Sequence, residues 1–140
     1  DQSLRNAPDP SGLDLSEAAD IAVLSFGPMG GVRRALRIAE AIGLPCVVTS
    51  TGETSVGLAG GVALAGVLPE LPYACALGTR ALLAGDVVAP GRWLIPVDGC
   101  LPVAPMPPGP DGDLLERFAL TDPDRVTWWR QRLTAALSLG

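Results

Sequence analysis

The sequence contains no lysine and no histidine, and all ten of its basic residues are arginine. Without these two residue types, the printed chain cannot supply a Schiff-base amine, a P-loop lysine, a Ser-His-Asp triad or a histidine-ligated metal. Any chemistry that the chain performs must therefore use carboxylates, hydroxyls, thiols or the backbone.

Positive charge is scarce as well, because ten basic residues face 15 acidic ones and the formal net charge is −5. Nucleic-acid binding needs clustered positive charge, so we expect no nucleic-acid partner. The longest apolar stretch, residues 56–68, is rich in glycine and alanine and is shorter than the ~20 residues that a membrane span requires. We therefore expect no membrane segment.

The three cysteines are widely spaced, odd in number and without the paired spacing of a metal site. No secretory signal precedes them, so the sequence predicts a cytoplasmic protein with free thiols. Cys46 and Cys75 lie in apolar runs, where buried and unreactive thiols are expected. The first residue is Asp1 rather than Met, which we interpret as a start within a longer sequence that could carry lysines and metal ligands upstream.

Short apolar runs alternate with helical patterns through the first two thirds of the chain. Residues 21–26, 46–48 and 73–77 are predicted strands, and the helical patterns that follow them cover about 32–42, 56–67 and 79–83. With 48% hydrophobic residues, the chain can build the core of one domain. Repeated βα units require a parallel sheet, and at this point an open sheet and a barrel both remain possible.

The last third of the chain has fewer regular patterns. Residues 90–103 surround Asp98 and Gly99 and suggest a hairpin, and residues 105–112 hold four prolines and two glycines, which is typical of a surface connector. A final helix over about 123–137 has Asp122 as its cap. In this helix Val126, Trp129, Leu133 and Leu137 are expected to face inward, Arg130 and Arg132 to face outward, and Trp128 and Trp129 to pack within the fold.

Two loops follow predicted strands, where parallel α/β folds hold their ligands. In the first, Gly30 and Gly31 open a helix and would let backbone N–H groups approach an anion, although a plain tight turn also explains them. The second loop, residues 49–55, carries five hydroxyls and Glu53 and could bind a polar ligand. Its alternative role is local, with Thr54 or Ser55 capping the next helix. Glycines 57, 60, 61 and 66 are expected to permit close helix packing.

Several runs of residues occur together in a recognisable order. They are Gly27-Pro28-Met29-Gly30-Gly31, Glu53-Thr54-Ser55-Val56-Gly57-Leu58, Leu71-Pro72-Tyr73-Ala74-Cys75 and Leu94-Ile95-Pro96-Val97-Asp98-Gly99, preceded by Asp1-Gln2-Ser3-Leu4-Arg5. In these runs the chain resembles the carboxyl-terminal part of o-succinylbenzoate synthase, in its actinobacterial type, a family of the enolase superfamily. Only the final 35 or so residues lack such motifs.

This resemblance implies an α/β fold, the carboxyl-terminal portion of a (β/α) TIM-like barrel, with about three βα units and a carboxyl-terminal helix. It divides the chain into barrel units at 1–104, a connector at 105–113 and the terminal helix at 114–140. The amino-terminal half of the same barrel is then the missing partner. The oligomeric state stays open.

The resemblance also implies a reaction, namely dehydration of a succinyl-hydroxycyclohexadiene carboxylate to o-succinylbenzoate in menaquinone biosynthesis. Mg²⁺ would stabilise the enediolate, and Asp1 matches one of the carboxylates that bind it. Ser25 stands where the family has a lysine, and a neutral hydroxyl cannot replace an ammonium charge. By resemblance, the carboxylate substrate is bound by Gly30, Gly31, Ser50, Thr51, Glu53, Thr54 and Ser55. Because the other metal ligands and lysines would lie upstream, this chain alone should be inactive.

Two other functions compete with this one. An N-succinylamino acid racemase of the same superfamily is the nearest enzymatic alternative, but racemisation needs bases on both faces of the substrate, which Ser25 would impair directly. The second alternative is a non-catalytic αβ module that binds a partner through the surface left open by the missing half. The absence of lysine and histidine supports this second alternative.

Overall fold

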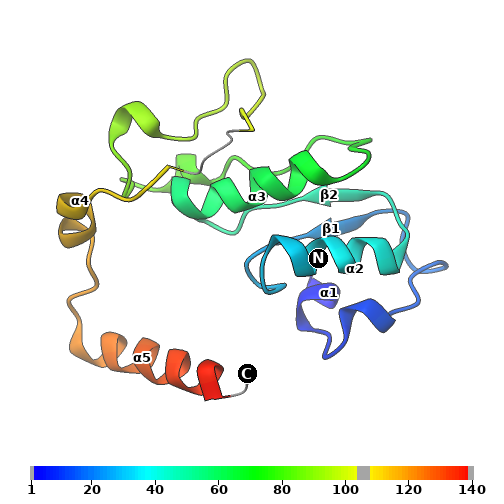
Figure 1. Cartoon of the computed structure of the whole chain (residues 1–140), viewed down its shortest axis with the longest axis horizontal. Helices are drawn as coiled ribbons and strands as arrows, with labels where there is room; N and C mark the ends of the chain where they lie inside the picture. Colours follow the sequence, from blue (N-terminus) through cyan, green and yellow to red (C-terminus); the bar gives the residue numbers. More distant parts are fainter. Residues whose placement is uncertain (1, 104–107, 139–140) are drawn as a thin grey trace.

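Two short parallel strands, β1 (Ala22–Leu24) and β2 (Cys46–Val48), form the centre of the structure, a computed structural model that describes residues 2–103 and 108–138 (Figure 1). The helices are α1 (Gln2–Asn6), α2 (Val32–Ile42), α3 (Ser55–Val67), α4 (Gly112–Arg117) and α5 (Pro123–Ser138). Short 3₁₀ helices occur at η1 (Pro10–Gly12), η2 (Thr79–Leu82) and η3 (Pro90–Arg92). The predicted order of strands and helices between residues 21 and 67 is confirmed.

The boundaries of α2 follow from the glycines on either side of it. Gly31 precedes the helix with φ 101°, and Gly43 ends it in the left-handed conformation with φ 68°. Ala35, Ile38 and Ala39 are buried between them, at the spacing of one helical face. This buried face is what fastens α2 to the strands.

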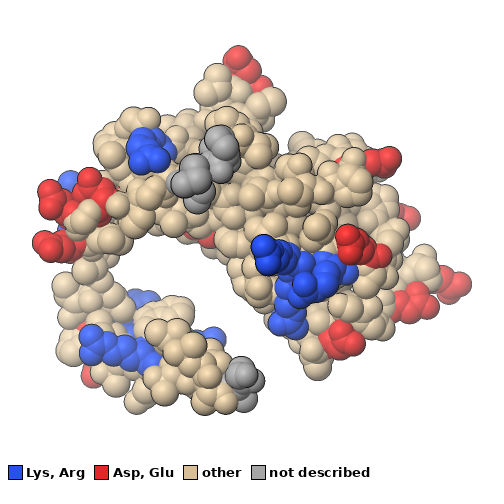
Figure 2. Space-filling view, viewed as in Figure 1, with Lys and Arg blue, Asp and Glu red and all other residues tan. Residues whose placement is uncertain are grey.

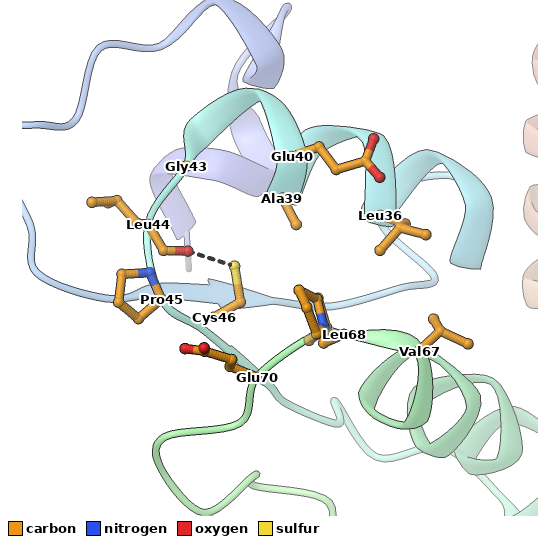
Figure 3. Close-up of a pocket in the computed structure, with 11 residues that line it drawn as sticks. Leu36, Ala39, Glu40, Gly43, Leu44, Pro45, Cys46, Val67, Leu68 and Glu70 are labelled. Carbon is orange, nitrogen blue, oxygen red and sulfur yellow. Dashed lines mark hydrogen bonds between the residues drawn. The ribbon is translucent and has the colours of Figure 1, made fainter.

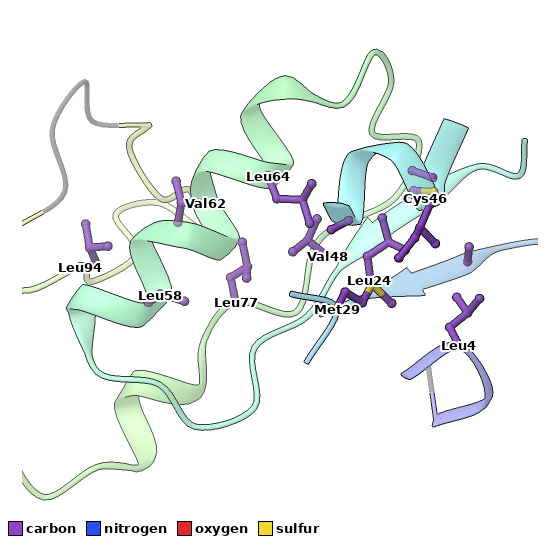
Figure 4. Close-up of a cluster of buried hydrophobic side chains, with 14 residues drawn as sticks. Leu4, Leu24, Met29, Cys46, Val48, Leu58, Val62, Leu64, Leu77 and Leu94 are labelled. Atoms are coloured by element: carbon purple, nitrogen blue, oxygen red, sulfur yellow. The ribbon is translucent and has the colours of Figure 1, made fainter. Parts of the chain in front are cut away.

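The strands alternate in burial, as expected when one sheet face is covered by helices. Ala22 and Leu24 are buried and Val23 is half-buried, and β2 repeats the same pattern. The buried side chains join those of α2 and α3 in one hydrophobic cluster (Figure 4). The opposite face of this two-stranded sheet is thus only partly covered within the described chain.

Glycines in α3 let other segments come close to the helix, as predicted. A Cβ on Gly60 would overlap the Phe26 ring, and one on Gly61 would lie 3.0 Å from the Leu77 side chain. Near the carboxyl end of α3, a Cβ on Gly66 would likewise lie close to the Val103 side chain. These contacts bring the segment after β1 and the segments at Leu77 and Val103 close to one helix.

The predicted third strand at 73–77 is confirmed only in minimal form, as one parallel bridge between Thr49 and Ala76. Pro72 lacks an N–H, and the Val48 N–H is contacted by the sulfur of Cys75, so the ladder does not extend toward the start of this segment. The hairpin prediction is confirmed in minimal form, since Val97 and Cys100 pair across Asp98 and Gly99, both with positive φ.

The carboxyl-terminal part of the chain is an arm that lies apart from the strands (Figure 1). Helix α5 matches the predicted helix, and Asp122 caps it through the Arg125 N–H at 3.0 Å. The prediction that its apolar residues face inward is wrong for this chain, because Trp129, Leu133 and Leu137 are 53%, 62% and 74% exposed. Figure 2 shows an open hollow between the arm and the body. Helix α4 precedes α5 and overlaps the start of the segment 114–140.

The described part of the chain therefore has a mixed α/β fold built on a small parallel sheet. Among the described residues, no helix combines the length and apolar character needed to cross a membrane. Asp1 and residues 104–107 lie outside the described part, so the predicted Asp1 site and residues 105–107 of the predicted connector do too.

Candidate functional site

The carboxyl ends of β1 and β2 meet the segment at Ala76, and this edge carries the candidate site. The Thr49 N–H donates to the Leu24 carbonyl at 2.8 Å, and the Ser50 N–H donates to the Ala76 carbonyl at 2.9 Å. Ser25 directly follows Leu24. Parallel pairing thus places Ser25, the hydroxyl loop (residues 49–55) and the start of η2 along one edge.

A network of hydroxyls fixes the first half of the hydroxyl loop. The Thr79 hydroxyl donates to the Ser50 hydroxyl at 2.7 Å, and the Ser50 hydroxyl donates to the Ala76 carbonyl at 3.0 Å. The Thr79 oxygen also accepts the Gly52 N–H at 3.1 Å. Ser50 is consequently buried and committed to structure, whereas Thr51 is exposed.

Glu53 closes the tip of the loop onto itself. One carboxylate oxygen accepts the Thr51 N–H at 2.6 Å, and the other accepts the Thr51 hydroxyl at 2.9 Å. Thr54 precedes α3, yet its side chain does not cap the helix. The half-exposed Thr54 hydroxyl is therefore free of intramolecular hydrogen bonds among the described residues, which leaves it open to a ligand.

Ser55 begins α3 and is completely buried, held by a carboxylate 31 residues away. Its hydroxyl donates to Asp86 at 2.6 Å and its N–H donates to the same carboxylate at 3.0 Å. Arg80 Nε donates to the same Asp86 oxygen at 3.0 Å, and the Leu94 N–H donates to the Ser55 hydroxyl. Ser55 thus joins the start of α3 to the segments at Asp86 and Leu94, and this arrangement is called the clamp below. Its hydroxyl is therefore not available to a ligand.

The electrostatics of this clamp favour an ionised carboxylate. Burial raises the pKa of Asp86, but hydrogen bonds from the Ser55 hydroxyl and N–H, together with Arg80 and its charge, outweigh burial and leave the pKa below its ordinary value. A charged Asp86 at the start of α3 also complements the positive end of the helix dipole. The second half of the hydroxyl loop is held in place by this ionised group.

Ser25 lies at the strand end in a different situation. Its side chain is only 1% exposed, and its hydroxyl has no hydrogen-bond partner among the described residues. A buried, unsatisfied hydroxyl costs about 1–3 kcal/mol. The structure therefore places at this edge a polar group with an unmet hydrogen bond.

The glycine turn before α2 uses its own amides. The Gly30 N–H donates to the Gly27 carbonyl at 3.0 Å, and the Gly31 N–H donates to the Phe26 carbonyl at 2.8 Å. Because both N–H groups are bonded within the turn, the anion-binding interpretation of these two amides has no support in this geometry. Both residues have positive φ, which is the conformational reason for glycine here.

No group of three or more histidine, cysteine, aspartate or glutamate side chains that could hold a metal ion occurs among the described residues.

A groove lies at the other end of the strands and is separate from this edge (Figure 3). It has a volume of about 630 Å³ and runs between the ends of α2 and α3, with Glu40 and Glu70 among its lining residues. Cys46 is buried there, its thiol donates to the Leu44 carbonyl at 3.2 Å, and burial raises its pKa. The prediction that Cys46 is buried is thus confirmed, whereas Cys75, which was also predicted to be buried, is only half-buried.

Sequence reasoning missed Thr79, Arg80 and Asp86, which organise the hydroxyl loop. Nothing local connects Asp86 with Ser55, because their contact depends on tertiary structure. One available signal was that Arg80 and Asp86 are the only charged residues between Glu70 and Arg92. Charges isolated in an apolar segment are typical of a buried ion pair.

Comparisons with known proteins agree with the fold. The muconate lactonizing enzyme from Pseudomonas putida matches 85% of this chain with 34% of its own, at a TM-score of 0.72 and 27% sequence identity. That enzyme is a TIM barrel of the enolase superfamily, so the described chain has the fold of part of an enolase-superfamily barrel. No family model matches the chain.

Curated relatives identify more specific relatives of the chain within the enolase superfamily. The o-succinylbenzoate synthase of Thermobifida fusca is 52% identical over 137 residues, 97% of this chain. Those of Mycobacterium leprae and Mycolicibacterium smegmatis are 44% and 45% identical over 99% of it. The chain is a homologue of these actinobacterial o-succinylbenzoate synthases and spans about 40% of their length.

Proposed function

We propose that this chain is the carboxyl-terminal part of an o-succinylbenzoate synthase, which dehydrates a succinyl-hydroxycyclohexadiene carboxylate. The observation that carries the proposal is the 52% identity to the Thermobifida fusca synthase over 97% of the chain. Its free cysteines fit a reducing cytoplasm, where we place the enzyme.

The role of this chain in that reaction is to bind and orient the carboxylate substrate. Thr51 and Thr54 are the hydroxyl-loop residues best placed for this, because they are not buried as Ser50 and Ser55 are. Glu53 holds Thr51, so it positions a donor and does not need to touch the substrate. Gly30 and Gly31 shape the neighbouring turn on the substrate side.

The Mg²⁺ that the family resemblance implies is a separate part of the proposal. The described residues do not form a site for it. We therefore assign metal binding to Asp1, which lies outside the described part, and to carboxylates on the remainder of the barrel. When bound, the ion would offset negative charge that develops next to the substrate carboxylate.

The remainder of the barrel is the proposed partner of this chain. Two surfaces support it, namely the half-covered face of the sheet and the exposed apolar face of α5. Barrels close every strand edge, whereas a two-stranded sheet leaves edges open to association. An enzyme that is complete therefore needs both parts.

A chimera tests the proposal, because the chain covers only part of the active site. The 137 matched residues of the Thermobifida fusca synthase would be replaced by this chain, and formation of o-succinylbenzoate would be followed. We expect a folded barrel with weak dehydratase activity, and an increase of about 100-fold or more when Ser25→Lys restores a cation at the strand end. Ser11→Lys, at an exposed serine, is the matched control and should change nothing.

The same chimera separates the alternatives. Racemisation of an N-succinylamino acid that exceeds dehydration would replace the synthase by the racemase. The neutral Ser25, at the position where the family resemblance implies a lysine, is the observation that favours a non-catalytic module. A well-folded chimera without either activity, both with Ser25 and with Ser25→Lys, would establish that module and end the proposal of an enzyme.

A further inference from the structure

The hydroxyl of Thr79 joins η2 to two residues of the hydroxyl loop. It donates to the Ser50 hydroxyl at 2.7 Å and accepts the Gly52 N–H at 3.1 Å. Ser50 and Gly52 stand on either side of Thr51 in the sequence. One side chain, 27 residues beyond Gly52, therefore holds both neighbours of a residue to which the proposed function gives contact with the substrate.

The direction of these hydrogen bonds follows from what each hydroxyl can do, because a hydroxyl donates one proton and accepts at two lone pairs. Ser50 donates to the Ala76 carbonyl at 3.0 Å, so its oxygen acts as the acceptor for Thr79. With its own proton directed at Ser50, Thr79 uses a lone pair to accept the Gly52 N–H. Hydrogen bonds linked in this way strengthen one another. Valine has nearly the shape of threonine but can neither donate nor accept.

The tip of the hydroxyl loop needs an anchor of this kind. Thr51 and Gly52 are both exposed, and Gly52 has a φ of 101°, in the region that glycine enters freely. Glu53 bonds to the N–H and the hydroxyl of Thr51, but it belongs to the same loop and moves with it. Glu53 thus shapes the tip, whereas Thr79 fixes the tip relative to the strand ends.

We propose that Thr79 is a positioning residue for substrate binding, and this inference rests on the proposed function. Its hydroxyl keeps Thr51 at the strand ends without touching the substrate itself. A loop that is held in its binding conformation loses less entropy when the ligand binds. Because the loop contacts the substrate both before and during the reaction, losing the anchor should raise KM and leave kcat nearly unchanged.

The test uses a complete barrel, namely the chimera with the Thermobifida fusca synthase in whichever of its Ser25 and Ser25→Lys forms turns over faster. Thr79→Val should raise KM about 5- to 10-fold, as expected for the loss of one or two hydrogen bonds, and leave kcat within about twofold. Thr79→Ser keeps the hydroxyl and should return KM to within about twofold of the parent value. Thr121→Val, at an exposed threonine between α4 and α5, is the matched control and should change neither constant.

The split between KM and kcat separates positioning from a merely structural role. A variant that only unfolds more readily has fewer active molecules, so its apparent kcat falls while its KM stays the same. Circular dichroism and the melting temperature show which variants are folded. If Thr79→Val does not fold, Thr79→Ala removes the same hydroxyl with a smaller side chain and carries the same expectation. An unchanged KM in the folded variant, or a KM that Thr79→Ser does not restore, would overturn the inference.

Binding of o-succinylbenzoate, measured by isothermal titration calorimetry on the same folded chimeras, separates this inference from the proposed function. Thr79→Val should weaken binding by about the same factor as it raises KM. Equal affinity in the parent and in Thr79→Val would overturn the role of Thr79 and leave the proposed function standing. A folded parent chimera that neither forms nor binds o-succinylbenzoate would overturn both.

Discussion

Helices α2 and α5 each have an apolar face, but in this chain the face of α2 is buried and that of α5 is exposed. The apolar face of α2 is buried against the strands, with Ala35 and Ile38 almost inaccessible to solvent. The corresponding face of α5 is open, with Leu133 62% exposed. The difference teaches that a periodic pattern specifies a helix and its apolar face, whereas the surface that covers this face can lie outside the chain. The relatives are about 2.5 times as long as this chain, which agrees with that interpretation.

The largest expected effect concerns the clamp that attaches α3 to the segment around Asp86. Asp86→Ala would leave Arg80 buried without its partner and remove the acceptor of Ser55, so we expect a loss of about 3–5 kcal/mol in the free energy of unfolding. Urea unfolding followed by tryptophan fluorescence measures this loss. Asp124→Ala, at an exposed aspartate of α5, is the control. A loss of equal size in the control would refute the distinction between body and arm.

Leucines of the two regions provide the most direct pairwise test of the comparison. Leu24→Ala removes a fully buried side chain and should cost about 2–5 kcal/mol, because it leaves a cavity. The same change at Leu133 should cost less than about 0.5 kcal/mol, because this side chain is exposed. Both values come from the same urea titration. A substantial cost at Leu133 would mean that α5 packs onto the body in solution.

Close packing on α3 should make one glycine sensitive to a single methyl group. Gly60→Ala places a Cβ against the Phe26 ring, and the expected strain of about 1–3 kcal/mol exceeds the gain of about 1 kcal/mol in helix propensity. Thermal unfolding should show a lower melting temperature. Gly112→Ala in α4 meets no atom within 4 Å and should not lower it, and a more stable Gly60→Ala variant would contradict the packing described here.

The pH dependence of stability provides a smaller effect. The pKa of Asp86 is lowered in the folded chain, so its contribution is complete above the unfolded-state pKa of ~3.9 and is lost as the pH falls through the folded-state value. We therefore expect Asp86→Asn to be less stable at neutral pH but to lose less stability on acidification below about pH 4. Unfolding midpoints measured from pH 7 to pH 2 would test this, with Asp124→Asn as control. Parallel curves for the unchanged chain, Asp86→Asn and Asp124→Asn would exclude a role for Asp86 in the pH dependence of stability.

The sequence was most informative where local rules apply. The strands at β1 and β2, both long helices of the body and the Asp98-Gly99 turn follow from periodicity and turn chemistry. The third strand was overpredicted because apolar content does not reveal whether a partner strand remains available for pairing. The prediction that the apolar face of α5 is buried was wrong, because periodicity contains no information about which surface covers that face.

The candidate site was only partly predictable for a similar reason. The position of the hydroxyl loop after β2 follows from the strand pattern. The distinction between Thr54, which is open, and Ser55, which is buried in the clamp, requires the distant Asp86. The roles of Ser25, Gly30, Gly31 and the loop residues in substrate binding stay predictions, as does the division of the chain at residues 104 and 113.

The solvent accessibility of Trp128 and Trp129 tests most directly whether this chain is part of a larger barrel. Acrylamide quenching would be measured in the isolated chain and in the chimera with the Thermobifida fusca synthase, each with Trp93→Phe to remove the third tryptophan. We predict strong quenching in the isolated chain, where both rings are about half exposed, and markedly weaker quenching in the chimera, where the barrel covers α5. Equally strong quenching in a folded chimera would contradict the account.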